Sequence, residues 1–247
     1  MTDTNTYRFL IEYDGTEFAG WQRQGQGERT VQETLETALE QILQHPVSLI
    51  GAGRTDAGVH AEGMVASAKF PTPKMSLDRL MLAVNSMCEH DVQIHELTEA
   101  APDFHARFSA VSRSYRYRLE CVRHPMFHRF SWVPPFDWND SKIADAVVLI
   151  PGRHCFRSFC LERPGETEYI SNVLSAVWEP DSSGATFRIT ADRFFHKMVR
   201  SLVMGLYDVG RGYHSLEDFR KLLDQPDPAI PVRVAPAQGL TLVSVGY

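Results

Sequence analysis

The sequence has little of what disulfide-rich, metal-bound or membrane-spanning proteins need. Its 247 residues include four cysteines without any Cys-x-x-Cys pair, so neither a disulfide framework nor a zinc ribbon is indicated. The longest aliphatic run, residues 146–150, is far too short to cross a bilayer, and the polar start gives no export signal. His124 and His128 flank Pro125 and have no third ligand nearby, which argues against a metal site. We therefore expect a reduced, cytoplasmic protein with no metal and no membrane partner.

Positive charge is also in deficit, and lysine is scarce. The chain has 25 Lys and Arg against 31 Asp and Glu, a net charge of -6, which argues against coating nucleic acid by bulk charge. However, 20 of the basic residues are Arg, whose planar guanidinium grips phosphates and stacks on bases. Between His105 and Arg129 there are six arginines and one acid, Glu120. We expect a locally basic cleft on an acidic body, able to bind RNA through shape and confined phosphate contacts.

Both common glycine-rich phosphate-binding motifs are absent. There is no G-x-G-x-x-G, and Val59 and His60 stand where a P-loop needs Lys and Ser or Thr, so we expect no nucleotide cofactor. Residues 51–58 nevertheless contain three glycines around Arg54 and Asp56. One interpretation is an ordinary loop in which Asp56 bonds its own backbone. The other makes Asp56 a nucleophile or base that a nearby Arg keeps ionised.

Hydrophobic periodicity predicts strands and helices that do not strictly alternate. This mixture favours an α+β fold over a doubly wound parallel sheet. A helix should begin after a Thr30 cap and end before Pro46. Strands are expected over residues 7–14, 47–52, 64–70, 92–97, 111–122, 170–178, 185–191 and 240–245, and further helices over 76–87, 140–150, 194–209 and 215–223.

Seven short motifs follow one another over residues 13–243. They are Tyr-Asp-Gly-Thr-x-Phe-x-Gly-Trp-Gln-Arg-Gln (13–24), Thr-Val-Gln-Glu-x-Leu-Glu (30–36), Gly-Arg-Thr-Asp-Ala-Gly-Val-His (53–60), Phe-His-Ala-Arg-Phe-Ser-Ala (104–110), Tyr-Arg-Tyr (115–117), Phe-x-x-x-Met-Val-Arg (194–200) and Gly-Leu-x-Leu-Val (239–243). In this order they resemble the motifs of the TruA family of tRNA pseudouridine synthases. Two places depart from the family pattern: Asn85 is followed by Ser-Met-Cys-Glu rather than x-x-Leu-Pro, and Glu168 replaces the Arg of an Arg-x-Ile.

The resemblance implies a tRNA isomerase. It would break the N1–C1′ bond of a uridine at positions 38 to 40 of the anticodon stem-loop, turn the uracil and rejoin it through C5. Asp56 would be the catalytic nucleophile, attacking either the sugar or the base, and Arg54 would hold the flipped nucleotide. Tyr115 would stack on the uracil and offer its hydroxyl for moving the C5 proton. Arg200 would pair with Asp56, and Leu240 would line the pocket.

Arg200 and His60 can also be judged from their own surroundings. Arg200 lies in an otherwise apolar helix, where a buried guanidinium would require a carboxylate or phosphate partner. His60 follows the Asp56 motif, and we expect a hydrogen-bonding residue rather than an acid. Phe194 and Phe195 are expected to be packing residues.

The family resemblance further implies two related α/β halves with mixed, largely antiparallel sheets. Residues 1–103 would carry the Asp56 loop, and residues 104–247 would complete the active site of a homodimer that binds tRNA. No cofactor is expected, because the isomerisation exchanges one bond for another. Three alternatives remain: a synthase of this family acting on another RNA position, an inactive RNA-binding paralogue, and a hydrolase. The hydrolase is least favoured, because no paired carboxylate or metal-binding group accompanies Asp56.

Overall fold

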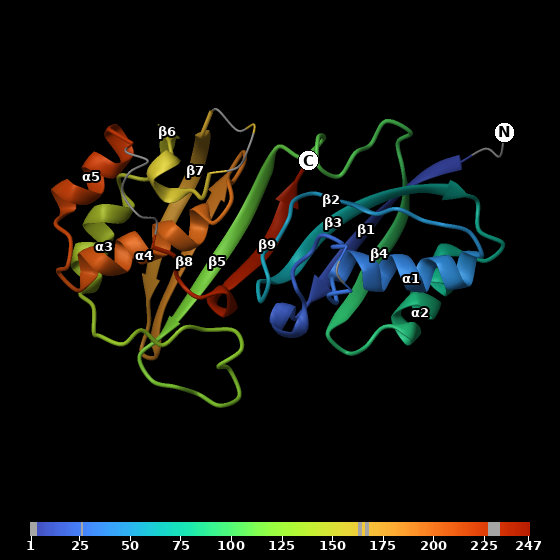
Figure 1. The fold of residues 1–247 in the computed structure, drawn as a ribbon, viewed down its shortest axis with the longest axis horizontal. Helices are drawn as coiled ribbons and strands as arrows, with labels where there is room; N and C mark the ends of the chain where they lie inside the picture. Colours follow the sequence, from blue (N-terminus) through green and yellow to red (C-terminus); the bar gives the residue numbers. More distant parts are fainter. Residues whose placement is uncertain (1–3, 26, 163–164, 166–167, 227–232) are drawn as a thin grey trace. The chain divides into compact units, whose positions relative to one another are not determined.

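The computed structural model describes residues 4–25, 27–162, 165, 168–226 and 233–247 (Figure 1). They form two compact units. The first unit contains the described residues up to Val111 together with Leu242–Tyr247, and the second unit is Ser112–Thr241. Compared with the expected halves, 1–103 and 104–247, the first unit extends farther and also takes in the last strand of the chain.

The first unit is a sheet covered by two helices. Strand β1 (Thr4–Tyr13) is antiparallel to both β3 (His60–Pro71) and β4 (Val92–Ala100), and the short β2 (Ile50–Gly51) pairs with β3. Alternate residues of β1 are buried, as a half-buried strand requires. Helices α1 (Val31–Leu43) and α2 (Leu77–Met87) contact each other, and α2 contacts β4. Their apolar faces meet the sheet in a core that includes Phe9, Ile11, Leu35, Leu39, Leu80 and Val84.

Both ends of α1 have the predicted causes. The Thr30 side chain accepts a hydrogen bond from the Glu33 amide, which satisfies one of the unpaired N–H groups of the first turn. At the other end Gln44 adopts a left-handed conformation (φ 60°), and Pro46 follows. The sequence therefore predicted this helix, its Thr30 cap and its end before Pro46, whereas the left-handed Gln44 was not predicted.

The end of the chain is attached to the first unit. Strand β9 (Leu240–Gly246) neighbours β3, and the Val111 amide donates to the Gly246 carbonyl over 2.8 Å. Tyr247 donates its hydroxyl to the Ala106 carbonyl over 2.8 Å. Residues far apart in the sequence thus complete one folding unit.

The second unit is built on a four-stranded antiparallel sheet in the order β5-β8-β7-β6. The strands are β5 (Ser112–Glu120), β6 (Gly152–Cys155), β7 (Ile170–Pro180) and β8 (Gly184–Ala191). Helices α3 (Asp140–Val147), α4 (Met198–Gly210) and α5 (Leu216–Asp224) contact one another. Helix α3 also contacts β7, and α5 contacts β6. The α+β class with mainly antiparallel strands is therefore confirmed.

Several boundaries differ from the predicted ones. Helix α4 begins at Met198 rather than at residue 194, because Lys197 has a left-handed conformation (φ 67°) that interrupts any helix. The strand predicted over 47–52 is reduced to Ile50–Gly51, and α3 ends at Val147 rather than at residue 150. Strand β6 was not predicted, since four residues with one apolar side chain show no alternation.

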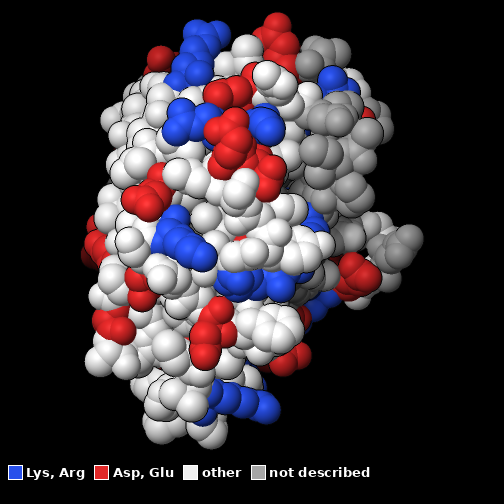
Figure 2. Space-filling view, turned by 90° about the vertical axis from the view of Figure 1, so that its left-hand side faces the viewer, with Lys and Arg blue, Asp and Glu red and all other residues white. Residues whose placement is uncertain are grey.

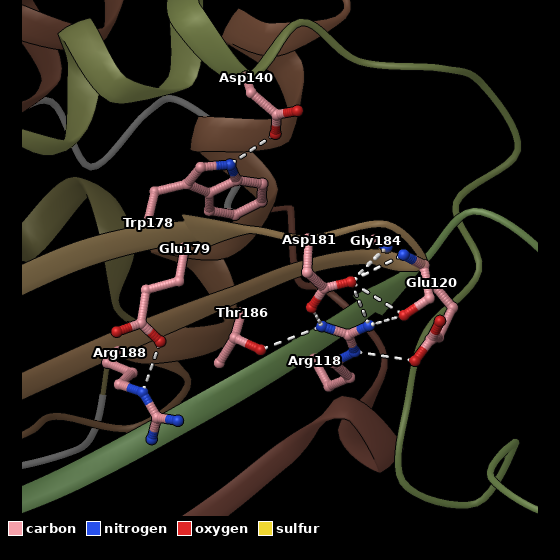
Figure 3. A network of polar contacts seen from close by, with 10 residues as sticks. Arg118, Glu120, Asp140, Trp178, Glu179, Asp181, Gly184, Thr186 and Arg188 are labelled. Carbon is pink, nitrogen blue, oxygen red and sulfur yellow. Dashed lines mark hydrogen bonds and ion pairs between the residues drawn. The ribbon is translucent and has the colours of Figure 1, made fainter.

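Charged side chains of the second unit are paired across its sheet (Figure 3). Arg118 on β5 donates from Nη1 and Nη2 to the two carboxylate oxygens of Asp181, and from Nε to Glu120 Oε1 over 2.8 Å. On the neighbouring strands, Arg188 Nε donates to Glu179 Oε2 over 2.7 Å. One of the six arginines expected in a basic cleft is therefore engaged by two carboxylates.

The face of the second unit that carries α3 and α5 is electrostatically mixed. Figure 2 shows that blue and red side chains are interspersed on the face that carries α3 and α5, and no large area of one sign is visible outside the grey residues. None of the helices in the described part of the chain has both the length and the apolar character needed to cross a membrane.

Candidate active site

Asp56 lies in a tight turn of the first unit, between β2 and β3. The Val59 amide donates to the Asp56 carbonyl over 3.1 Å, and Gly58 takes the positive φ (75°) that this turn requires. The Asp56 side chain is half-buried, so it is neither lost in the core nor fully solvated. The turn fixes the backbone of Asp56, while its carboxylate remains accessible from outside the unit.

The turn that carries Asp56 is packed against residues of the 13–24 motif. The Trp21 amide donates to the Thr55 carbonyl over 3.2 Å, and the Tyr13 hydroxyl lies 2.8 Å from Thr55 Oγ1. Gly20 has φ 99°, and a Cβ there would lie 2.6 Å from the Thr55 carbonyl oxygen. Two motifs separated by about thirty residues in sequence thus form one packed structure. Its effect is to hold the residue before Asp56 from three directions.

Arg54 is exposed and is oriented by a chain of amide side chains. Its Nε donates to Gln22 Oε1 over 3.1 Å, and Gln22 Nε2 donates to Gln32 Oε1 over 2.7 Å. Gln32 in turn donates to Glu36 Oε1 over 2.8 Å, and the same oxygen accepts from the Leu49 amide. Gln32 and Glu36 are buried on α1, where polar residues are uncommon. Sequence reasoning missed this relay, although two buried-face polar residues four apart on a helix were a signal for it.

His60 is buried at the start of β3 and serves as a hydrogen-bond partner. The Gly15 amide donates to its Nδ1 over 3.0 Å, and Asp14 Oδ1 lies 3.1 Å from the same nitrogen. Gly15 belongs to the Asp-Gly of the first motif, so His60 ties that turn to the strand after Asp56. The expected hydrogen-bonding role is confirmed.

Tyr115 lies on β5 of the second unit and is half-buried. Phe194 meets it edge to face, with ring centroids 5.1 Å apart and an interplanar angle of 87°. This geometry is favourable for aromatic pairs and fixes the plane of the Tyr115 ring. Phe194 was expected to be a packing residue, and the structure shows that it packs against the Tyr115 ring.

Arg200 and Leu240 are connected through the segment that precedes β9. Arg200 Nε donates to the Ala235 carbonyl over 2.7 Å, and the Ala235 amide donates to the Arg200 carbonyl over 3.1 Å. The buried Tyr117 donates to the Pro236 carbonyl over 2.8 Å, and burial raises the pKa of its phenol, so this donor stays protonated. Leu240 follows and is buried. Arg200 itself is half-buried, so it need not have the ionic partner that full burial would demand.

The expected site residues therefore fall into two groups. Arg54 and Asp56 share one loop of the first unit, whereas Tyr115, Arg200 and Leu240 belong to the second unit. The pairing of Arg200 with Asp56 and the pocket role of Leu240 stay predictions. Among the residues that the structure describes, no three or more His, Cys, Asp or Glu side chains gather as a metal site would require.

The chain matches a family model described as tRNA pseudouridine synthase over residues 10–109 and 146–247. A tRNA pseudouridine synthase A of Chlorobaculum tepidum is 39% identical over 244 residues, which are 98% of this chain and 98% of the relative. That of Bacteroides fragilis is 35% identical over 98% of this chain and 96% of its own length. The enzyme of Leifsonia xyli subsp. xyli is 39% identical over all of this chain and 93% of its own.

This chain belongs to the tRNA pseudouridine synthase family. Enzymes of this family are isomerases, and the resemblance found in the sequence motifs is confirmed. Asp56, Arg54, Arg200 and Leu240 lie within the two matched ranges, and Tyr115 lies between them.

Proposed function

We propose that this pseudouridine synthase isomerises uridine to pseudouridine at positions 38 to 40 of the tRNA anticodon stem-loop, with Asp56 as nucleophile. The observation that carries the proposal is the Asp56 turn, which places a half-buried carboxylate next to Thr55, a residue held by Trp21 and Tyr13. Relatives that share the full length are named as tRNA pseudouridine synthases A, which supports tRNA as the substrate.

The reaction conserves all atoms. The N1–C1′ bond of the uridine breaks, the uracil turns while it is held, and a C5–C1′ bond forms. The C5 proton then leaves and a proton is taken up at N1. Asp56 attacks the sugar or the base and so stabilises the stage at which the N1–C1′ bond is broken. Tyr115 stacks on the uracil, and its hydroxyl moves the C5 proton. No external redox equivalent or transferred group is needed.

Arg54 assists substrate opening. A uridine stacked in the stem-loop must be flipped out at a cost of about a few kcal/mol, and its place must be filled. The exposed guanidinium of Arg54 carries the charge and the planar shape for this task, and the relay through Gln22 limits its orientations.

Release of tritium tests the activity directly. A tRNA transcript with uridine at positions 38 to 40, labelled at C5, should lose its label in the presence of the protein without added cofactor. Asp56→Asn should abolish the release and keep tRNA binding. Glu17→Gln, which changes an exposed carboxylate of the same unit, should behave as wild type.

Mapping the product separates the alternatives. Pseudouridine found only outside positions 38 to 40 would contradict the substrate assignment and support a synthase of another position. Binding without any conversion would indicate an inactive paralogue. Full activity of the Asp56→Asn variant would refute the mechanism.

A homodimer is also part of the proposal. An acidic chain whose arginines are concentrated in residues 105–129 gains contacts with a large tRNA when two copies contribute to one binding surface. Light scattering of the purified protein should give twice the mass of the 28.0 kDa chain, and a monomer that is fully active would contradict this.

A further inference from the structure

Helix α4 contains a buried carboxylate that none of the roles above uses. The side chain of Asp208 is 3% exposed, and both of its oxygens are held by arginines. Oδ1 accepts from Arg211 Nε over 2.9 Å, and Oδ2 accepts from Arg233 Nη1 over 2.7 Å. Well-packed apolar residues often stabilise a core as well as a buried ion pair does, so such a group calls for a purpose beyond stability.

The two arginines differ in what they attach to Asp208. Arg211 directly follows α4, and its guanidinium lies over the Tyr213 ring, 4.3 Å from the centroid. It therefore belongs to the same local structure as Asp208. Arg233 also lies over the Tyr213 ring, 5.3 Å from the centroid, but it comes 25 residues after Asp208, so its ion pair attaches a separate part of the chain to α4.

That part is the anchor segment, residues 233–239, which leads into β9. Its next contact is the reciprocal pair of hydrogen bonds between Ala235 and Arg200, which lies two helical turns before Asp208 on α4. Its third is the bond from Tyr117 to the Pro236 carbonyl. The anchor segment is thus fixed to α4 at two points and to β5 at one.

The segment touches two of the residues expected in the active site. Arg200 is bonded to its middle, and Leu240 is the residue that follows its end. A displacement of the segment would therefore move the Arg200 guanidinium and the Leu240 side chain together.

We propose that Asp208 is a positioning residue for uridine isomerisation, which holds Arg200 and Leu240 in place through Arg233 and the anchor segment. The inference rests on the proposed function, since it names the contacts that hold Arg200 and Leu240 of that site in position. Asp208 does not touch the uridine. A misplacement of about 1 Å far from the reacting atoms can cost about 100-fold in rate, so a rigid link of this kind has a large effect on turnover.

The two arginines provide a matched pair of variants. Arg233→Met and Arg211→Met each remove one guanidinium from Asp208, but only the first releases the anchor segment. We expect kcat to fall between about 10- and 100-fold in Arg233→Met with KM and tRNA affinity unchanged. Arg211→Met should stay within about threefold of wild-type kcat, and Arg233→Lys should recover part of the loss because it restores a cation. All rates are compared below the unfolding transition of each variant.

Amide hydrogen exchange at Ala235 gives a second, activity-independent measurement. Exchange should become faster in Arg233→Met and stay as in wild type in Arg211→Met. Equal kcat losses in the two variants, or unchanged Ala235 exchange in Arg233→Met, would overturn the proposal. If the wild-type protein forms no pseudouridine, the proposed function fails, and the exchange experiment alone decides whether Asp208 fixes the segment.

Discussion

Removing the Arg118 side chain should destabilise the second unit strongly, because Glu120 is left without its donor. The Glu120 side chain is 10% exposed; its Oε1 accepts from Arg118, and its Oε2 is buried with no recorded partner (Figure 3). Arg118→Met would therefore leave a buried carboxylate uncompensated. Loss of one partner from a buried ion pair typically costs about 3–5 kcal/mol.

One structural fact places the expected loss at the lower end of this range. The Asp181 side chain is 47% exposed, so its own pairing with Arg118 contributes little, about 0–1 kcal/mol. We expect Arg118→Met to lower the free energy of unfolding by about 3 kcal/mol at pH 7.

A second background isolates the contribution of the Glu120 charge. Placing Arg118→Met in a Glu120→Gln background should cost only about 1 kcal/mol, because no buried charge remains.

Urea unfolding followed by tryptophan fluorescence measures these differences, since Trp132, Trp138 and Trp178 all belong to the second unit. A loss below about 1 kcal/mol at pH 7 would show that water or a rearranged side chain satisfies Glu120. Equal losses in the wild-type and Glu120→Gln backgrounds would show that Glu120 is not the group responsible.

Three further outcomes are expected. Gly20→Ala places a Cβ 2.6 Å from the Thr55 carbonyl oxygen at φ 99°, and should cost about 1–3 kcal/mol in unfolding experiments and slow isomerisation; an unchanged melting temperature would contradict it. Thr30→Ala removes the α1 cap and should cost about 1 kcal/mol by urea titration, whereas Thr30→Ser should be nearly neutral. Arg118 holds the pKa of Asp181 below its ordinary value, so this carboxylate stabilises the fold above about pH 4 and its contribution disappears as the pH falls; Asp181→Asn should flatten the acid limb of the stability profile.

Local patterns predicted the fold where the cause of a structure lies within a few residues. The α1 helix is such a case, because its cap, apolar face and stop occupy one continuous stretch. Helix α4 is a counter-example. Its apolar run continues back to residue 194, and the left-handed Lys197 that shortens it arises from its tertiary setting rather than from a glycine.

The same distinction applies to the candidate site. The Asp56 motif was visible in sequence because chemistry and turn formation act on neighbouring residues. The relay from Glu36 to Arg54 was not, since its four members come from three separate segments that meet only in the fold. The link between Asp208 and Arg233 was hidden for the same reason, as 25 residues separate the two charges.

The attachment of Leu242–Tyr247 to the first unit has a consequence for how the protein is made. Ribosomes deliver these residues only after the whole second unit, which at about 5–20 residues per second means a delay on the order of 10 seconds. During that interval strand β3 lacks its neighbour β9, so the part of its edge that β2 does not pair stays open, the feature by which nascent sheets associate wrongly. The first unit begins to emerge from the ribosome before the second, yet it is completed after it.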